Sequence, residues 1–477
     1  MDEQHGAWWT PGVPGQRVPG SLTRVENGWR LSLIGTLMVN AGGGDGLHLV
    51  PPHTIWGSCH GVPYTLLECF LDDEVRGPGP DVTDSASNDQ WTMKWRVGQV
   101  VRGGEMAKET RFSSAQFEIT GLPAWWATSG LRGPQVRPGA YSPPDDVVIA
   151  LDDGTLHIGV REVRHLGRRA RSVRERVVVM VKRDSGFTLD ELEREITGPM
   201  RALVAIGVDE PVSVFNLLIT RDDSPTKGRE LRLAVDPPDG REPEEPKPGM
   251  HAPLPLSPSL VEVPSFIPAW LKLARRSSVP LDAVEPRQRS GSLQLQLLDV
   301  VNAAETLHRA LHDEPAEHPF AARVRETLRA SGEFNSDERR SVHDAVKVFV
   351  GVTLEKRLLA LAEDLGPDVC EWLFNDAVRP WAMVTASIRN ALSHGFPAPH
   401  GVHEDPGALV GALHLTEAVI TLRLLTEAGL SSSADLTTQL GRHHRLRSLA
   451  NQSVADWPAL AHRINPQQWP QPRPDDS

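Results

Sequence analysis

Cysteine is scarce in this chain of 477 residues, and no long apolar run opens it. Cys59, Cys69 and Cys370 are too few and too scattered for a disulfide framework or a four-thiolate zinc site. We interpret them as reduced, mostly buried side chains. Residues 1–5 are acidic rather than basic, and no stretch suited to a secretory signal or a membrane span follows them. We therefore expect a soluble, cytoplasmic protein with no membrane partner.

Basic residues are outnumbered by acidic residues. Lys and Arg number 50 against 62 Asp and Glu, a formal net charge of −12, which argues against a protein that coats nucleic acid through its overall charge. A local basic groove remains open. The GxxxxGK[ST] phosphate loop and the GxSxG elbow are absent, so nucleotide hydrolysis and serine esterase chemistry lack their usual motifs. The length favours two principal domains.

The first half of the chain has the pattern of a β-rich domain, with turn residues between short strand-like segments. Between about residues 28 and 183, Gly, Pro and Asp separate short apolar and alternating runs. Strands are expected at residues 29–35, 64–70, 176–181 and 212–219. We predict an α+β chain in which residues 1–235 form a sandwich-like or curved antiparallel sheet.

A helix and a linker are expected within and after this domain. Thr188 and Glu191 have the spacing of a capping box, which predicts a helix start, and Gly198 with Pro199 should interrupt or kink that helix. Residues 236–258 are rich in Pro, Glu and Gly and have few apolar anchors, so we interpret them as a domain linker.

The apolar period changes beyond the linker from two to about 3.6 residues, which indicates helices. Helices are expected over residues 293–311, 346–361, 381–394 and 409–425. Gly429 suits the position after the last of them. The sequence thus predicts an α-helical bundle at residues 259–435, followed by a tail at 436–477 whose last residues are loose.

One short motif contains the residue types that an active site would need. Arg389, Asn390 and His394 place a guanidinium, an amide and an imidazole at the end of a predicted helix, which Gly395 and Pro397 stop. Such groups can bind a phosphate and move a proton beside it. Asn390 and His394 are four residues apart and share a face, so the amide could orient the imidazole. Arg389 lies about 140° away around the helix and must reach across or meet a second copy of the motif.

Residues 389–394 resemble the Arg-x4–6-His signature of the HEPN superfamily, and residues 260–432 are similar to the HEPN domain of ApeA-type anti-phage proteins. The first half is similar to the ApeA N-terminal domain. Four short segments carry that second resemblance, at residues 31–35, 55–57, 64–66 and 187–192.

The resemblance implies an anti-phage defence effector that cuts RNA as a homodimer, without metal or another cofactor. Arg389, Asn390 and His394 would be its catalytic residues. It also implies that an imidazole takes the proton of the RNA 2′-hydroxyl while the arginine stabilises charge on the phosphate. The N-terminal domain would then be the sensing or inhibitory part, responding to a phage-derived trigger.

Three alternatives stay open. The bundle could be a non-catalytic HEPN module that only binds RNA or dimerises. His394, His400, His403 and Asp405 invite a zinc interpretation, although their spacing lacks the regularity of a ligand helix. Glu305 and His308 could support the site from a neighbouring helix, but an exposed helix-face pair explains them as well, and they are left out of the catalytic set.

The densest basic segment is a further candidate for RNA contact. Arg164, Arg168, Arg169 and Arg171 surround a glycine turn and could touch phosphates. A solvated hairpin loop between two strands explains them equally well, because no aromatic residue is interleaved for base stacking. The tryptophans near the two ends are interpreted as packing anchors, namely Trp8, Trp9, Trp457 and Trp469.

Overall fold

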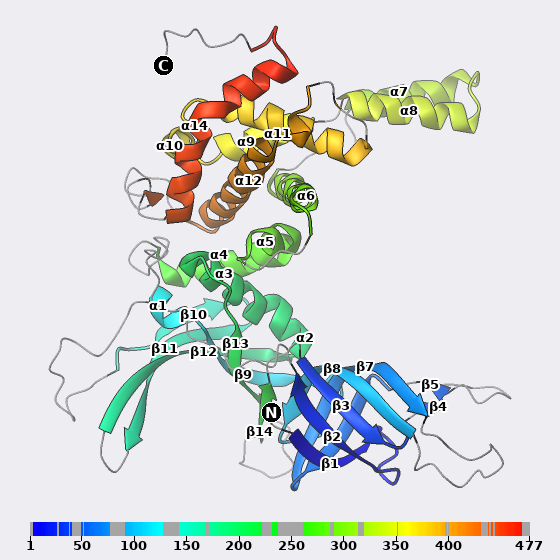
Figure 1. Cartoon of the computed structure of the whole chain (residues 1–477), viewed down its shortest axis with the longest axis vertical. Coiled ribbons are helices and arrows are strands. Elements are labelled where there is room, and N and C mark those ends of the chain that lie inside the picture. The colour runs from blue at the N-terminus through cyan, green and yellow to red at the C-terminus, as the bar shows by residue number, and fades with distance from the viewer. Residues whose placement is uncertain are drawn as a thin grey trace. The chain divides into compact units, whose positions relative to one another are not determined.

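A computed structural model of the chain contains two compact units, one made mainly of residues 1–249 and the other mainly of residues 269–477. Its elements are drawn in Figure 1. The structure describes residues 3–25, 28–37, 39–40, 49–50, 52–76, 91–126, 143–166, 171–221, 231–236, 261–286, 291–312, 319–350, 352–395, 398, 400–430, 437, 440–441 and 444–469. The predicted linker at 236–258 lies outside them except for its first residue.

The N-terminal unit is β-rich, as the sequence predicts. Its strands are β1 (Glu3–Trp9), β2 (Val18–Val25), β3 (Gly28–Ile34), β4 (Val39–Asn40), β5 (Leu49–Val50), β6 (Thr54–Cys59), β7 (Val62–Arg76), β8 (Trp91–Arg102), β9 (Phe112–Ile119), β10 (Val147–Leu151), β11 (Gly154–Leu166), β12 (Arg171–Phe187), β13 (Val214–Arg221) and β14 (Leu231–Asp236). Its helical segments are α1 (Leu122–Trp126), α2 (Leu189–Leu192), the π-helical η2 (Glu193–Thr197) and α3 (Gly198–Val208). All four predicted strands are therefore confirmed.

One part of the sheet closes into a barrel, drawn in blue in Figure 1. The strand order is β8-β3-β2-β1-β6-β7, and β7 pairs back onto β8 in antiparallel register. The curved antiparallel sheet of the prediction is thus confirmed, and closure removes the free edges that a sandwich would leave. Apolar side chains fill the barrel, among them Trp8, Leu31 and Trp95, all fully buried.

Trp8 requires a glycine opposite it. Strand β1 pairs with β6, where Trp8 faces Gly57. A Cβ atom on Gly57 would meet the Trp8 ring at 2.2 Å, so only glycine allows this contact. Trp9 is buried as well, and the prediction that the N-terminal tryptophans are packing anchors is confirmed.

Six further strands extend the barrel into an open antiparallel sheet in the order β10-β11-β12-β9-β13-β14, which joins β8, whereas β4 and β5 form a separate two-stranded sheet. One face of this sheet is apolar and buried, with residues such as Ala115, Phe117 and Val181. The other face carries polar side chains, as alternation along a strand requires.

The predicted capping box is confirmed at the start of α2. Thr188 Oγ1 accepts a hydrogen bond from the Glu191 N–H, and Glu191 returns one to the Thr188 N–H. The expected interruption at Gly198 takes the form of the π-helical turn η2, after which the helical path continues as α3. A π-turn suits this place because Pro199 has no N–H to donate to the preceding turn.

The C-terminal unit is α-helical, as predicted. Its helices are α4 (Val263–Arg276, which begins in the first unit), α5 (Ser278–Val284), α6 (Leu293–Leu311), α7 (Pro319–Ser331), α8 (Ser336–Val350), α9 (Leu354–Glu363), α10 (Pro367–Phe374), α11 (Val378–His394), the short η3 (Val402–Glu404), α12 (Pro406–Glu427) and α14 (His444–Ile464). Helices α6, α9, α11 and α12 contact one another, and α14 packs on α11 and α12. Gly429 follows α12 with a positive φ of 110°, as the sequence predicts.

Two helical expectations need correction. The predicted helix over 346–361 consists of the end of α8 and all of α9, because the Thr353 side chain accepts from the Lys356 N–H and starts a new helix. The predicted tail at 436–477 contains α14, which packs on α11 and α12 through buried residues such as Trp457 and Leu460. Trp469 donates to the Met383 sulfur at 3.3 Å, so both late tryptophans are packing anchors.

Helix α12 is the central helix of this unit. It is the one described helix that is long and apolar enough to cross a membrane, but 78% of its most apolar window is buried inside the protein. Its burial shows that it serves as a core helix here.

Candidate active site

The predicted motif lies at the C-terminal end of α11. Trp381 and Ile388 of this helix are fully buried, which fixes its rotation in the bundle. The helix ends at His394, and Gly395 follows in the left-handed conformation with a φ of 65°. The predicted glycine stop is therefore confirmed, whereas Pro397 lies outside the described residues.

The Arg389 guanidinium turns toward α6 and α9. Its Nη2 lies 3.6 Å from Glu305 Oε2 on α6, and its side chain is 26% exposed. Arg357, in the first turn of α9, bonds the other oxygen of the Glu305 carboxylate and is 11% exposed. Arg309 donates to that same oxygen at 2.8 Å. Three guanidinium groups therefore converge on one carboxylate.

The Glu305 carboxylate, 17% exposed, is shared by these three guanidinium groups. Partial burial lowers the effective dielectric constant, so these ion pairs act more strongly than they would in open solvent. The planar guanidinium fork of Arg389 matches the oxygens of a phosphate.

Asn390 and His394 occupy another side of α11 from Arg389. Both are exposed, and the Asn390 Oδ1 lies 3.4 Å from the Arg389 Nη1. The expected hydrogen bond from Asn390 to the imidazole is not formed, because the amide oxygen faces the guanidinium instead. Among the residues that the structure describes, His394 has no hydrogen bond or ion pair, so its ring is accessible to a substrate.

Glu305 is the site residue that the sequence interpretation left out. The explanation of Glu305 and His308 as an exposed helix-face pair is wrong, because His308 is buried and Glu305 is mostly covered. The signal was present: Glu305 follows the buried Val301 by four residues and so shares its face of α6. Arg357 carried the same signal, since the buried Leu361 follows it by four residues on α9.

A second set of polar contacts extends along α6 from this cluster. The rings of His308 and His312 stack with centroids 4.2 Å apart, and the His312 Nε2 lies 3.1 Å from Asp364. Arg423 on α12 approaches the same carboxylate at 3.5 Å. These contacts join the ends of α6 and α9 to α12 and hold the helices that carry the arginine cluster.

Two groups of the zinc alternative, Asp405 and His400, are engaged in other contacts. Asp405 accepts from the N–H groups of Gly407 and Ala408 at the start of α12 and pairs with Arg463 at 3.1 Å. These hydrogen bonds keep the pKa of the Asp405 carboxyl below its usual value. The His400 Nδ1 accepts from the Val402 N–H, and burial lowers the pKa of His400. No group of three or more possible metal ligands occurs in the described part of the chain.

The basic segment forms the end of the β11–β12 hairpin. Residues 166 and 171 face each other across the two strands. Arg168 and Arg169 lie outside the described residues, and so do the side chains of Arg164 and Arg171. Their contact with RNA therefore stays a prediction.

Comparison with known proteins gives two family matches. Residues 3–266 match the ApeA N-terminal domain 1, and residues 298–434 match the Apea-like HEPN domain. Neither a curated protein nor a solved structure matches the chain. An HEPN domain is consistent with ribonuclease activity and with an RNA substrate. Because the first match spans more than half of the sequence, this chain belongs to the ApeA family, with an HEPN domain in its second half.

Proposed function

We propose that the chain is a metal-independent endoribonuclease whose catalytic residues are Arg389, Asn390 and His394. The observation that carries this proposal is the position of the motif at the end of α11. Arg389 is held at the Glu305 carboxylate, which Arg309 and Arg357 also contact, while His394 is exposed. The HEPN match supports RNA as the substrate.

The chemistry needs one base, one acid and a group that stabilises the charged phosphate. The His394 imidazole takes the proton from an RNA 2′-hydroxyl, whose oxygen attacks the neighbouring phosphorus. Arg389 stabilises the negative charge that develops on the phosphate oxygens. The bond from phosphorus to the 5′-oxygen breaks, a second imidazole protonates that oxygen, and the products are a 2′,3′-cyclic phosphate and a 5′-hydroxyl.

A homodimer supplies the second imidazole. Within one α11 helix, positions 389 and 394 differ by about 140° of rotation, which separates a guanidinium held at α6 from an imidazole in solvent. Two copies of the motif facing each other across a twofold axis would bring one Arg389 to the other His394.

In a cell, such an activity must be restrained until it is needed. We assign the sensing or inhibitory role to the N-terminal unit and the role of a cytoplasmic anti-phage effector to the whole chain, with a phage-derived molecule as trigger. The family membership supports this assignment.

One expression experiment tests the proposed activity. Wild type, Arg389→Ala/His394→Ala and a matched control, Arg340→Ala/His5→Ala, are induced in phage-challenged cells, followed by growth and total RNA integrity. The control removes an exposed arginine of α8 and an exposed histidine of β1, neither of which belongs to the motif or the arginine cluster. RNA fragmentation by wild type and control alone is expected; equal behaviour of all three proteins would refute the proposal.

A non-catalytic HEPN module that binds RNA or dimerises is the second candidate. It is favoured by the ion pair of Arg389 with Glu305, which engages part of the guanidinium that a transition state would need. Unaltered RNA that co-purifies with wild type, together with no cleavage by the purified chain, would establish this candidate.

A further inference from the structure

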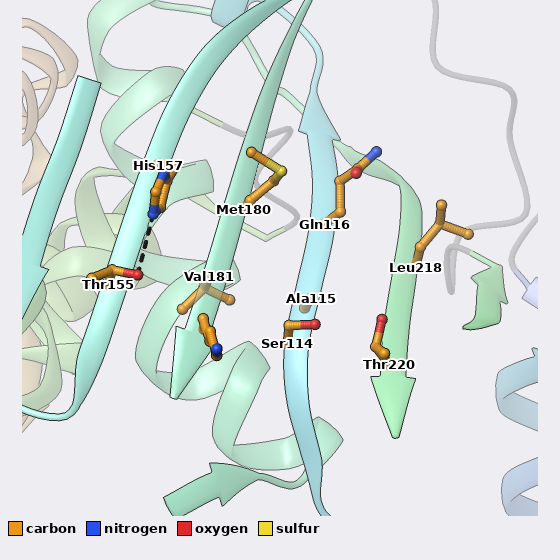
Figure 2. A pocket seen from close by; sticks show the side chains of 10 residues that line it. Ser114, Ala115, Gln116, Thr155, His157, Met180, Val181, Leu218 and Thr220 are labelled. Carbon is orange, nitrogen blue, oxygen red and sulfur yellow. Dashed lines mark hydrogen bonds between the residues drawn. The ribbon is translucent and has the colours of Figure 1, made fainter. Parts of the chain in front are cut away.

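The polar face of the open sheet contains a hollow of about 270 Å³ that neither the motif nor the arginine cluster uses. Four neighbouring strands form its floor, in the order β11, β12, β9 and β13. Figure 2 shows the side chains that line it. The volume is near the lower end of the range for small-molecule sites.

Strand register arranges these side chains in two rows across the sheet. In the first row Thr155, Lys182, Ser114 and Thr220 are successive partners on the four strands. In the second row His157, Met180, Gln116 and Leu218 are partners in the same order. The rows are two residues apart along each strand, roughly 7 Å, and four strands span roughly 14 Å.

The first row has the chemistry of an anion site. It offers three hydroxyl groups and one ammonium, all able to donate to an oxyanion. Lys182 has no ion pair with any residue that the structure describes. Other cations of this face are already matched, because Arg161 pairs with Asp146 at 2.6 Å and Arg176 lies 3.5 Å from Glu118.

The second row has the chemistry of a site for a flat polar ring. Met180 and Leu218 are half-buried apolar side chains on a face that is otherwise polar. Gln116 stands between them, with an amide that can both donate and accept at a ring edge. The His157 Nε2 lies 3.2 Å from the Thr155 Oγ1, which links this row to the first.

We propose that this hollow binds a nucleoside monophosphate. The phosphate lies on the row of Ser114, Lys182 and Thr220, and the base lies over Met180 with its edge toward Gln116. A mononucleotide fits both the distance between the rows and the volume, whereas an RNA strand would extend beyond a hollow of this size. The inference adds a ligand for the N-terminal unit to the proposed function.

Calorimetric titration of the intact chain tests the site. AMP, GMP, CMP and UMP are the probes, with the four nucleosides and inorganic phosphate as truncated ligands. At least one monophosphate should bind with micromolar affinity, and its nucleoside about tenfold more weakly or worse, because a charge-assisted contact is lost. Lys182→Gln should weaken binding by about tenfold, and Gln116→Leu should reduce the preference among bases.

Two comparisons decide the outcome: one with a matched lysine variant, and one with the protein that lacks the catalytic motif. Lys272→Gln removes an exposed lysine outside the hollow and should bind as wild type does. No binding of any monophosphate at millimolar concentration, or equal affinities of Lys182→Gln and Lys272→Gln, would overturn the proposal. So would binding of a ten-nucleotide single-stranded RNA without binding of mononucleotides. Titration of Arg389→Ala/His394→Ala separates this outcome from a failure of the proposed ribonuclease, since its nucleotide affinity should equal that of wild type.

Discussion

Arg389 owes its position to a single acidic residue on another helix. Glu305 receives Arg389 on one carboxylate oxygen and Arg309 and Arg357 on the other. Without that carboxylate, three guanidinium groups would face one another in a partly covered place, where repulsion is weakly screened. We infer that Glu305 is a positioning residue, which acts on the substrate only through Arg389.

Replacement of Glu305 tests this role. Glu305→Gln keeps the shape but removes the charge, so we expect a loss of about 1–3 kcal/mol in the free energy of unfolding and a marked fall in RNA cleavage. Chemical denaturation and a cleavage assay provide the two measurements. Glu326→Gln on α7 changes an exposed carboxylate in the same way and should alter neither. A Glu305→Gln protein with wild-type cleavage would show that Arg389 needs no such support.

At the scale of elements, residues 400–405 are tied to the start of α12 and the end of α14. Asp405 caps α12, and Arg463 of α14 donates both to Asp405 and to the His400 carbonyl, each at 3.1 Å. Helix α14 also packs on α11, the helix that carries His394, and so helps to hold it in place.

The Asp405 cap gives a stability prediction with a defined pH dependence. Asp405→Ala should lower the free energy of unfolding by about 0.5–2 kcal/mol at pH 7, and Asp405→Asn by less, because the amide oxygen still accepts. The pKa of Asp405 is lowered in the folded protein, first by the Ala408 N–H. Its contribution is therefore present above about pH 4 and is lost as the pH falls through the folded pKa. Unfolding of wild type and Asp405→Ala at pH 7 and pH 3.5 should give a difference that shrinks with acid; a constant difference would contradict the assignment.

Local signals in the sequence were sufficient for some elements and not for others. Alternation predicted the strand around Trp29, and a run of β-branched residues predicted the strand around Val179. The Thr188 hydroxyl with the Glu191 carboxylate predicted the start of α2, since these effects act within a few residues. Barrel closure depends on pairing of β7 with β8, which no local pattern encodes. The break between α8 and α9 was missed because apolar residues continue across Val352. Helix α14 was missed because its many polar residues obscure its apolar stripe.

The same division holds for the candidate site. The motif at Arg389 and His394 and the glycine stop after it could be predicted from the sequence, because they lie on one short stretch of chain. The partner of Arg389, Glu305, comes from α6, 84 residues earlier in the sequence, and Arg357, which shares that carboxylate, comes from α9, 32 residues before Arg389. Only packing brings them together. The polar hollow on the sheet also could not be predicted from the sequence, since it depends on the register of four strands.

At the scale of the whole molecule, the proposed site is divided between two copies of the chain. Homodimers of Arg389→Ala lack both guanidinium groups of the motif, and homodimers of His394→Ala lack both imidazoles. A mixed dimer retains one of each, from different copies. Mixing the two purified variants under conditions that allow subunit exchange should therefore restore part of the cleavage activity. Activity no higher than that of either variant alone would show that one Arg389 and one His394 from different copies do not form a working site.

The central claim concerns the His394 imidazole and the RNA 2′-hydroxyl. The direct test is the rate at which the purified chain cleaves single-stranded RNA in the presence of a strong chelator, compared between wild type and His394→Ala. We predict that wild type cleaves with undiminished rate, leaves a cyclic phosphate and does not cut DNA of the same sequence, and that His394→Ala is slower by about 10²–10⁴-fold with unchanged unfolding. Equal rates for the two proteins, or cleavage of the DNA, would contradict the account.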